Sequence, residues 1–383
     1  MRFKLATLLV LGAAGMAQAN PQETLTFTSV PSDGIENDAT NSVRTAVVAG
    51  TYGVSKIVIN AVLNSGGTGT YGYESVLKIT PPGGTPFYVE VSGIEAPFTT
   101  QTYTNLEVYL PTPVANAAGT WEVRFFETFN DGGVDSTWAT MSITLDDEAP
   151  GFVEATDAGD TLVTAMVPSG SGPLTSIYGS LNGDDDVYKI EICDAANFAA
   201  STTFSSFVDT RLFLFDANGM GVAFNDDYFP NTQDYYYQSR LQNFPVTAGT
   251  YYVGVSAFER MARTAAGDAI WNTQPYDTVR APDGPGAAGT LDNWGGTTDQ
   301  AGPYVLSLKG ACYATSTPTC GDQDFNGDGD FGTDQDIEAF FACLGGQCCA
   351  TCYVGGSDFN GDGDFGTDQD IESFFRVLSG GPC

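Results

Sequence analysis

The chain of 383 residues contains no histidine, and its 14 Lys and Arg residues are far outnumbered by 47 Asp and Glu residues. Without histidine, Ser-His and Cys-His nucleophilic sites and histidine-ligated zinc are excluded. The formal net charge of −33 argues against a nucleic-acid partner, because a phosphate backbone repels an acidic protein. The chain also lacks a Gly-x-Ser-x-Gly elbow and a phosphate-binding glycine loop with lysine. We therefore expect a protein that is not an enzyme, with a glycoside-hydrolysing carboxylate pair as the alternative.

Apolar runs long enough to cross a bilayer are also absent. Near the N-terminus, Arg2 and Lys4 precede the short apolar run Leu8–Gly15, which is followed by Ala17-Gln-Ala19. These are the three parts of a secretory signal peptide, and the run is too short for a membrane-spanning helix. We expect residues 1–19 to be removed and the protein to be secreted or displayed at the cell surface.

A near-identical repeat occupies the C-terminus. Residues 324–341 return as residues 358–375 with one change, Ala339 to Ser373. Each copy begins with oxygen-bearing side chains at alternate positions, and a glycine stands at the sixth position, as in EF-hand-type calcium loops. The predicted Ca²⁺ ligands are Asp324, Asn326, Asp328, Asp330 and Asp336 in the first copy, and Asp358, Asn360, Asp362, Asp364 and Asp370 in the second.

Apolar residues with helical spacing follow each loop. They are Ile337, Phe340, Phe341 and Leu344 in the first copy and Ile371, Phe374, Phe375 and Leu378 in the second. Residues 311–383 hold 13 acidic residues and a single basic one, Arg376. Bound Ca²⁺ would neutralise the loops, so that binding energy becomes folding energy. The alternative is a disordered acidic tail.

On these loop and helix positions, the segment 318–383 resembles the dockerin module, a duplicated loop–helix unit. The resemblance implies Ca²⁺-dependent docking onto a cohesin-like protein or another cell-surface component. It also implies partner contacts from Thr333 and Thr367. The family's acid at loop position twelve is replaced here by Gln335 and Gln369. The expected ligands are therefore the acids that directly precede the helices, Asp336 and Asp370, with Asp334 and Asp368 as the alternative.

Cysteine usage fits an exported protein. Six of the eight cysteines lie in or beside this module, and in an oxidising compartment they favour disulfides that supplement a small core. Cys349 and Cys352 have the spacing of a zinc knuckle, which is the alternative. Cys193 and Cys312 are candidates for a pair within the preceding domain.

The remaining residues have an all-β composition, with short alternating segments rich in Thr, Val, Tyr and Phe. Predicted strands are Lys56–Leu63, Ser75–Thr80, Pro86–Val91, Leu106–Leu110, Trp121–Glu127 and Met141–Leu145. The acidic, turn-rich stretch Asp146–Gly151 predicts a domain boundary. The overall expectation is a mostly β protein, with two jelly-roll-like β-sandwiches at 20–147 and 151–312 followed by the small α-helical calcium module.

Two further resemblances concern the sandwiches. Gly119–Arg124, Trp138 and Ser142–Leu145 make residues 20–147 similar to the P (Homo B) domain found beside subtilisin-like proteases. Trp121 and Trp138 favour core positions over sugar stacking. Residues 151–312 resemble the bacterial pre-peptidase C-terminal domain. The matching landmarks are Ile177–Ser180, Asp184–Ile190, Thr210–Asp216, Asn225–Asp227, Ala248–Val253 and Gly302–Leu306.

Three segments of the second sandwich could carry function. Asp184–Asp186 and Asn225–Asp227 place carboxylates in turns, either for another Ca²⁺ or simply as turn residues. The long segment Arg260–Thr298 contains Trp271 and Trp294 and could bind extracellular polysaccharide. The leading hypothesis is a non-catalytic exported modular protein with a calcium-dependent docking or anchoring module. Polysaccharide binding and a calcium-capped structural protein without a partner are the alternatives.

Overall fold

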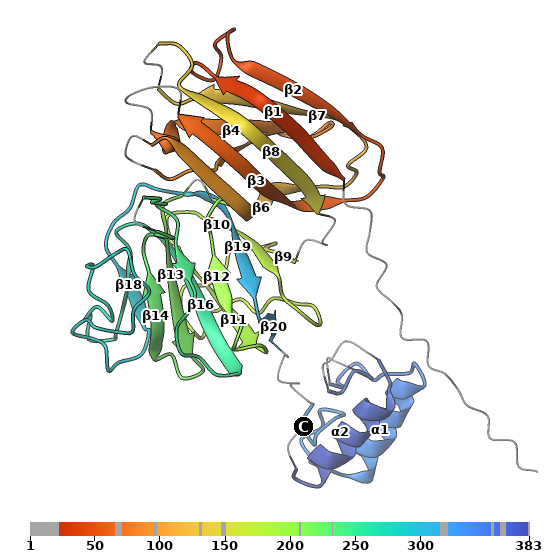
Figure 1. Cartoon of the computed structure of the whole chain (residues 1–383). Coiled ribbons are helices and arrows are strands. Elements are labelled where there is room, and N and C mark those ends of the chain that lie inside the picture. The colour runs from red at the N-terminus through yellow and green to blue at the C-terminus, as the bar shows by residue number, and fades with distance from the viewer. Residues whose placement is uncertain are drawn as a thin grey trace, which may run out of the picture. The chain divides into compact units, whose positions relative to one another are not determined.

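The computed structural model describes residues 23–65, 71–94, 98–129, 132–146, 151–206, 208–231, 233–314, 321–353, 356–360 and 365–381. The predicted leader at 1–19 lies outside these ranges. The fold is mostly β, with helices α1 (Asp334–Leu344) and α2 (Asp368–Leu378) near the C-terminus (Figure 1). The predicted fold class is confirmed. By contacts, the chain divides into two compact units, which are described separately.

The first unit comprises the chain up to residue 150 together with residues 202–207 and 228–237. It contains two four-stranded sheets, in the orders β1-β8-β3-β6 and β2-β7-β4-β5. The strands are β1 (Thr24–Ser32), β2 (Ser42–Val48), β3 (Val54–Ser65), β4 (Ser75–Thr80), β5 (Phe87–Glu90), β6 (Thr100–Val114), β7 (Gly119–Glu127) and β8 (Ser136–Asp146). All six strands predicted in this region are present.

Alternating apolar residues of both sheets fill the core of this unit, as expected for a sandwich. Trp121 and Trp138 are fully buried in it, which confirms the core interpretation. Asp234 is held within the same unit, because its Oδ1 accepts hydrogen bonds from Gly93 N at 3.2 Å and Tyr103 Oη at 3.1 Å. Residues 228–237 therefore belong to the first unit, although the chain has already entered the second sandwich.

The second unit contains two five-stranded sheets, in the orders β15-β12-β19-β10-β9 and β14-β13-β16-β11-β20. The strands are β9 (Phe152–Val153), β10 (Ser176–Leu181), β11 (Asp185–Ile192), β12 (Ala199–Ser201), β13 (Thr210–Asp216), β14 (Gly221–Asn225), β15 (Arg240–Leu241), β16 (Gly249–Ala257), β19 (Gly302–Lys309) and β20 (Ala311–Tyr313). The predicted pair Cys193–Cys312 is a disulfide with Cα atoms 5.9 Å apart.

Strand β13 is buried on both faces, and its two faces enter different cores. Leu212 and Leu214 pack into the interior of the sandwich. Phe213 and Phe215 pack into a second cluster with Trp271, and Trp294 lies against it. The long insertion, which includes the hairpin β17 (Met261–Arg263) and β18 (Asn293–Gly295), therefore supplies this second core.

This packing corrects the hypothesis of a tryptophan surface for polysaccharide. Trp271 is fully buried, and its ring centroid lies 5.6 Å from that of Phe213. Trp294 is half-buried, and its ring meets Phe213 edge-on at 4.9 Å. Side chains that contribute this much apolar area are more favourable in a core than on a surface. Trp271 therefore belongs to a core and presents no stacking surface, and Trp294 packs against the same core.

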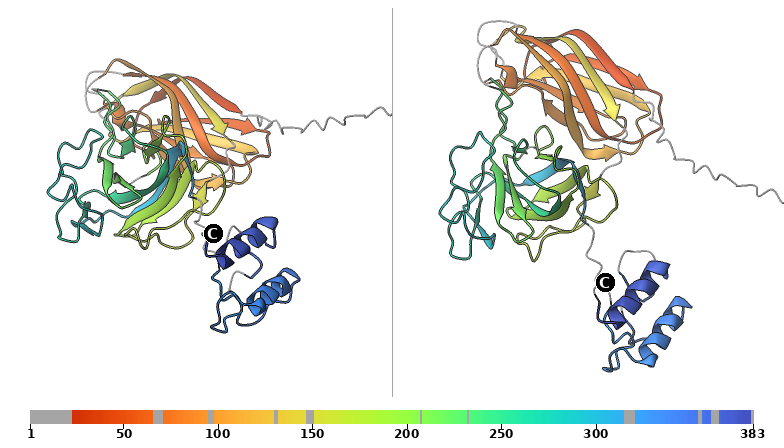
Figure 2. Two further views of the ribbon diagram at one scale, coloured as in Figure 1. Left: turned by 90° about the horizontal axis from the view of Figure 1, so that it is seen from below. Right: turned by 60° about the horizontal axis from the view of Figure 1, so that its bottom comes forward.

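The C-terminal repeats have their own small aromatic core. Phe325, Phe340, Phe359 and Phe374 are fully buried in it, and the rings of Phe340 and Phe374 stack with centroids 4.1 Å apart. Helices α1 and α2 lie side by side in both views of Figure 2. Equivalent residues of the two copies thus pack against each other.

Candidate metal centres

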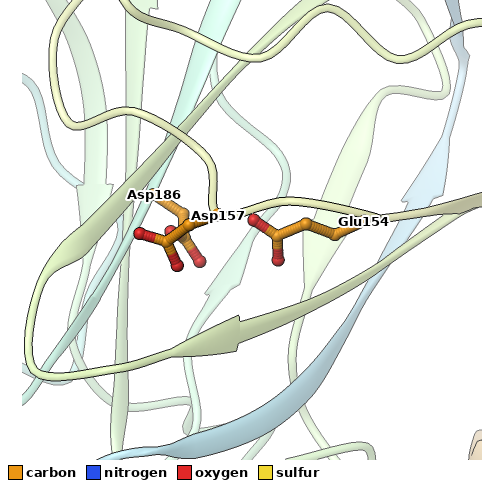
Figure 3. A group of neighbouring side chains, drawn as sticks. All are labelled: Glu154, Asp157 and Asp186. Atoms are coloured by element: carbon orange, nitrogen blue, oxygen red, sulfur yellow. The ribbon is translucent and has the colours of Figure 1, made fainter.

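Three acidic side chains meet at one edge of the second sandwich. One carboxylate oxygen from each of Glu154, Asp157 and Asp186 lies within 4.8 Å of the other two. Figure 3 shows the Glu154 carboxylate directed toward the other two. Glu154 directly follows β9, and Asp186 lies on β11. Because β9 pairs with β10 at Phe152 and Ile177, the residues after β9 are brought beside the turn that leads from β10 into β11. We call this group the Glu154 cluster.

Backbone and hydroxyl donors satisfy part of this cluster. Glu154 accepts hydrogen bonds from the backbone amides of Ala158 and Ser180, the latter at 3.1 Å. Asp186 Oδ2 accepts from Tyr304 Oη at 2.6 Å. Asp186 is 0% exposed, and within the part of the chain that the structure describes its Oδ1 has no hydrogen-bond partner. A buried carboxylate oxygen without a donor is costly.

The pKa values of these acids are displaced in the direction expected for crowded buried carboxylates. Burial raises the pKa of Asp186 to about 8, and the neighbouring charges of Glu154, Asp184 and Asp157 act in the same direction. Burial also raises the pKa of Glu154. Counting the described residues, no salt bridge to Lys or Arg joins any member of the cluster. An all-oxygen donor set of this charge can hold a hard metal ion.

The motif Asp184–Asp186 contributes one residue to this cluster. Asp186 joins Glu154 and Asp157, whereas Asp185 forms an ion pair with Arg260. Side chains of successive strand residues point to opposite faces, so two adjacent acids of β11 cannot serve one site. The sequence interpretation missed Glu154 and Asp157. Their spacing of three residues directly after the domain boundary was the available signal.

The second predicted motif, Asn225–Asp227, divides in a similar way. Asn225 serves the turn, because its Nδ2 donates to the carbonyl of Asp227 at 2.9 Å and its Oδ1 accepts from Arg240 N at 2.8 Å. Asp226 and Asp227 instead lie beside Asp209, and one carboxylate oxygen of each of the three residues lies within 4.8 Å of the others. The motif therefore combines turn chemistry with an acidic cluster.

In the first C-terminal loop, the predicted ligands surround one short stretch of backbone. Asp324 accepts from the amides of Asp328 and Gly329 at 3.0 and 2.9 Å, and Asn326 Oδ1 accepts from Asp328 N at 2.9 Å. Asp336 is fully buried, and it accepts from Asn326 N at 3.2 Å and Thr333 N at 2.8 Å. The helix acid thus reaches back into the loop.

Hydrogen bonds also act on the charge state of Asp336. Burial alone would raise its pKa, but donors from Thr333 and Asn326 outweigh that effect and lower the pKa. The alternative ligand Asp334 is exposed, as is the predicted ligand Asp330. The backbone amide of Asp330 donates to Asp328 Oδ1 at 2.9 Å.

The second loop repeats this arrangement where it is described. Asp370 is fully buried and accepts from Asn360 N at 3.3 Å and Thr367 N at 2.7 Å. Asp358 and Asn360 are nearly buried, and Asp368 is exposed. The predicted ligands Asp362 and Asp364 lie outside the described residues. Thr333 and Thr367 are the N-cap residues of α1 and α2, so their side chains are partly engaged in capping.

The cysteine chemistry of the module differs from the zinc alternative. Cys343 pairs with Cys348 and Cys349 pairs with Cys352 as disulfides. A disulfide sulfur is not a thiolate and does not bind zinc in this way. The zinc-knuckle interpretation of Cys349 and Cys352 is therefore wrong. Cys320 and Cys383 lie outside the described residues.

No protein-family model and no curated protein sequence matches this chain. Among solved structures, the serine protease of Aeromonas sobria in complex with its chaperone is 10% identical over 34% of this chain, with a TM-score of 0.23. The same protease alone is 11% identical over 33%, with a TM-score of 0.22. PNGF-II is 9% identical over 75% of this chain and 65% of its own, with a TM-score of 0.23. The matches span 27% and 26% of the two protease chains. Similarity this low carries no functional argument.

None of the helices that the structure describes has the length and apolar character needed to cross a membrane.

Proposed function

We propose that this protein is a non-catalytic, exported, Ca²⁺-stabilised modular protein whose C-terminal repeats form a dockerin-like docking or anchoring module. The two sandwiches are the parts that this module attaches, and they are proposed to be P-domain-like and pre-peptidase C-terminal-like. Calcium is the proposed ion at both C-terminal loops and at the Glu154 cluster, because the donors are oxygen atoms of Asp, Glu and Asn.

The observation that carries the proposal is the equivalent position of Asp336 and Asp370. Each lies at the first turn of its helix, is fully buried and accepts backbone hydrogen bonds from its own loop. Such a carboxylate is positioned to complete a set of loop oxygens around a cation, and the negative charge at a helix N-terminus is favourable as well. Two near-identical copies with the same arrangement support one shared role.

An exposed aromatic pair supports docking. Phe341 and Phe375 are 47% and 44% exposed, and their ring centroids lie 6.2 Å apart. Exposed acids Glu338 and Glu372 stand on the same helices. Apolar side chains that remain exposed next to each other mark interaction surfaces. A partner with apolar side chains flanked by basic residues would match this surface in both polarity and charge.

Calcium titration of the full oxidised chain without its leader tests the proposal. We expect Asp336→Ala and Asp370→Ala each to abolish binding at one C-terminal site, as measured by calorimetry. The matched controls are Asp334→Ala and Asp368→Ala, which remove the exposed acids two residues earlier. Equal losses in both pairs, or no binding at millimolar Ca²⁺, would refute the calcium sites.

Docking is tested separately with a panel of cohesin domains in Ca²⁺ and in chelator. Calcium-dependent capture that falls about tenfold or more in Phe341→Ser/Phe375→Ser would support the aromatic pair as a binding hot spot. Calcium binding without capture by any cohesin would leave a calcium-locked structural cap and refute cohesin-type docking.

A further inference from the structure

The second acidic group of the sandwich lies where two paired strands end. Asp209 directly precedes β13, and Asp226 and Asp227 directly follow β14. Because these strands are antiparallel, with Leu212 opposite Asn225, the start of one and the end of the other meet at the same edge. One carboxylate oxygen of each residue lies within 4.8 Å of the others. We call this group the Asp209 cluster.

Two members of the cluster are buried, the third, Asp209, is half-buried, and Arg211 pairs with Asp226. Asp226 is 1% exposed and Asp227 is 6% exposed. Arg211 Nη2 donates to Asp226 Oδ2 at 2.7 Å. Over the described ranges, Asp226 Oδ1 and Asp209 Oδ1 are both buried without a hydrogen-bond partner. The Arg211 guanidinium thus pairs with Asp226, and one buried oxygen each of Asp209 and Asp226 is left without a donor.

We propose that the Asp209 cluster binds a hard divalent cation, in addition to the calcium sites above. The donors are carboxylate oxygens, and the cluster contains neither sulfur nor imidazole, which favours Ca²⁺ over zinc or copper. A bound cation would reduce the repulsion among the three carboxylates, and it would give the orphaned oxygens of Asp209 and Asp226 a partner. The bound ion would join the start of β13 to the turn after β14.

Hydrogen bonds already fix the turn at residues 225–227, which would hold the ion. Asn225 already braces residues 225–227 through Asp227 O and Arg240 N, and the Asp227 amide donates to the carbonyl of Tyr276 at 3.0 Å. The backbone amides of Asp227 and Arg240 are therefore reporters of the site, because each donates a hydrogen bond within or beside the turn that the ion would hold.

The test counts bound Ca²⁺ per full oxidised chain by equilibrium dialysis. We expect Asp209→Asn to bind one ion fewer than the unchanged chain, and Asp277→Asn, which alters an exposed acid of the same unit, to bind the same number. The same loss of one ion is expected when Asp209→Asn is combined with Asp336→Ala and Asp370→Ala. Failure of the C-terminal sites and failure of this site are therefore distinguishable.

Hydrogen exchange on the unchanged chain provides a second readout if Asp209→Asn does not fold. We expect the amides of Asp227 and Arg240 to exchange about tenfold or more slowly in Ca²⁺ than in chelator, because the ion binds only the closed turn. An unchanged ion count in a folded Asp209→Asn chain would overturn the proposal. Exchange rates at these amides that do not respond to Ca²⁺ would also overturn the proposal. Protonation of Asp209 would then be the remaining way to reduce the negative charge of this group.

Discussion

The Glu154 cluster and the Asp209 cluster lie in the same unit and have the same number of carboxylates within the same 4.8 Å, yet they differ in their counter-ions. In the Asp209 cluster, Arg211 pairs with Asp226. In the Glu154 cluster, the described residues offer the hydroxyl of Tyr304 and backbone amides, but no paired cation. Two clusters with the same acidic geometry therefore differ in net charge. A cation is needed more at the Glu154 cluster, where the residues that the structure describes supply none.

A third buried acid extends the comparison to the first unit. Glu127 is 0% exposed, and it accepts hydrogen bonds from the hydroxyls of Ser75 at 3.1 Å and Ser136 at 2.8 Å. Burial raises its pKa to about 7. A single acid among hydroxyl groups can be neutralised by one proton, whereas each of the two clusters brings three carboxylates together.

The largest effect is expected from Arg211→Met, which would make the Asp209 cluster resemble the Glu154 cluster. Removing one partner of a buried ion pair leaves an uncompensated charge and should cost about 3–5 kcal/mol of unfolding free energy in chelator. Urea unfolding in chelator and in Ca²⁺ measures this. Ca²⁺ should restore part of the loss, because a cation bound among the carboxylates stabilises them more strongly when the guanidinium is absent.

The control for this variant is Arg44→Met, which removes an exposed arginine and should change stability by less than about 0.5 kcal/mol. If Arg211→Met lowers the unfolding free energy by the same amount with and without Ca²⁺, the Asp209 cluster does not bind the ion more strongly when its arginine is missing. That result would contradict the proposed equivalence of the two clusters.

Asp186→Asn is expected to have an effect of intermediate size on stability, with opposite signs in chelator and in Ca²⁺. In chelator the neutral amide removes repulsion within the Glu154 cluster and should stabilise the second unit by about 2–3 kcal/mol at pH 8. In Ca²⁺ the variant should be the less stable chain, because it lacks a ligand. Thermal unfolding in both conditions measures the crossover, with the exposed Asp160→Asn as control. If the variant is more stable than the unchanged chain in both conditions, or less stable in both, the proposal that the Glu154 cluster binds Ca²⁺ is wrong.

The smallest effect is expected from Glu127→Gln, which should change how the stability of the first unit depends on pH. The folded pKa of about 7 lies above the ordinary value of 4.5, so between these values the folded chain binds more protons than the unfolded one. Stability of the first unit should therefore fall as pH rises from about 4.5 to 7 and stay low above 7. Glu127→Gln should remove this fall and add about 1–2 kcal/mol at pH 8.

Urea unfolding across pH 4.5–8 measures the effect, and Glu122→Gln on the same strand β7 is the matched control. A pH profile of Glu127→Gln that still follows the unchanged chain would show that the buried proton of Glu127 does not set the stability of the first sandwich.

Much of the local structure could be predicted because it depends on short-range patterns. The alternating segments identified β3 through β8, and the spacing of Phe340, Phe341 and Leu344 identified α1. The repeat identified the loop–helix pairs, and the Cys193–Cys312 pair was a prediction that the structure confirms. The strands, the helix and the repeat each depend on a periodicity or spacing that is visible within one segment. The disulfide was predicted instead from the number of cysteines and the oxidising compartment.

The β-rich composition, the duplicated loops and the excess of acidic charge are all visible in the amino-acid sequence. Which acids meet depends on the tertiary structure. Asp186 joins Glu154 through strand pairing, and Asp209 joins Asp226 across the ends of β13 and β14. The tertiary structure also decided that Trp271 lies in a core and that residues 228–237 belong to the first unit. The physical reason is that periodicity reports which face of an element is apolar, whereas the partner of that face depends on the register and order of strands distant in sequence.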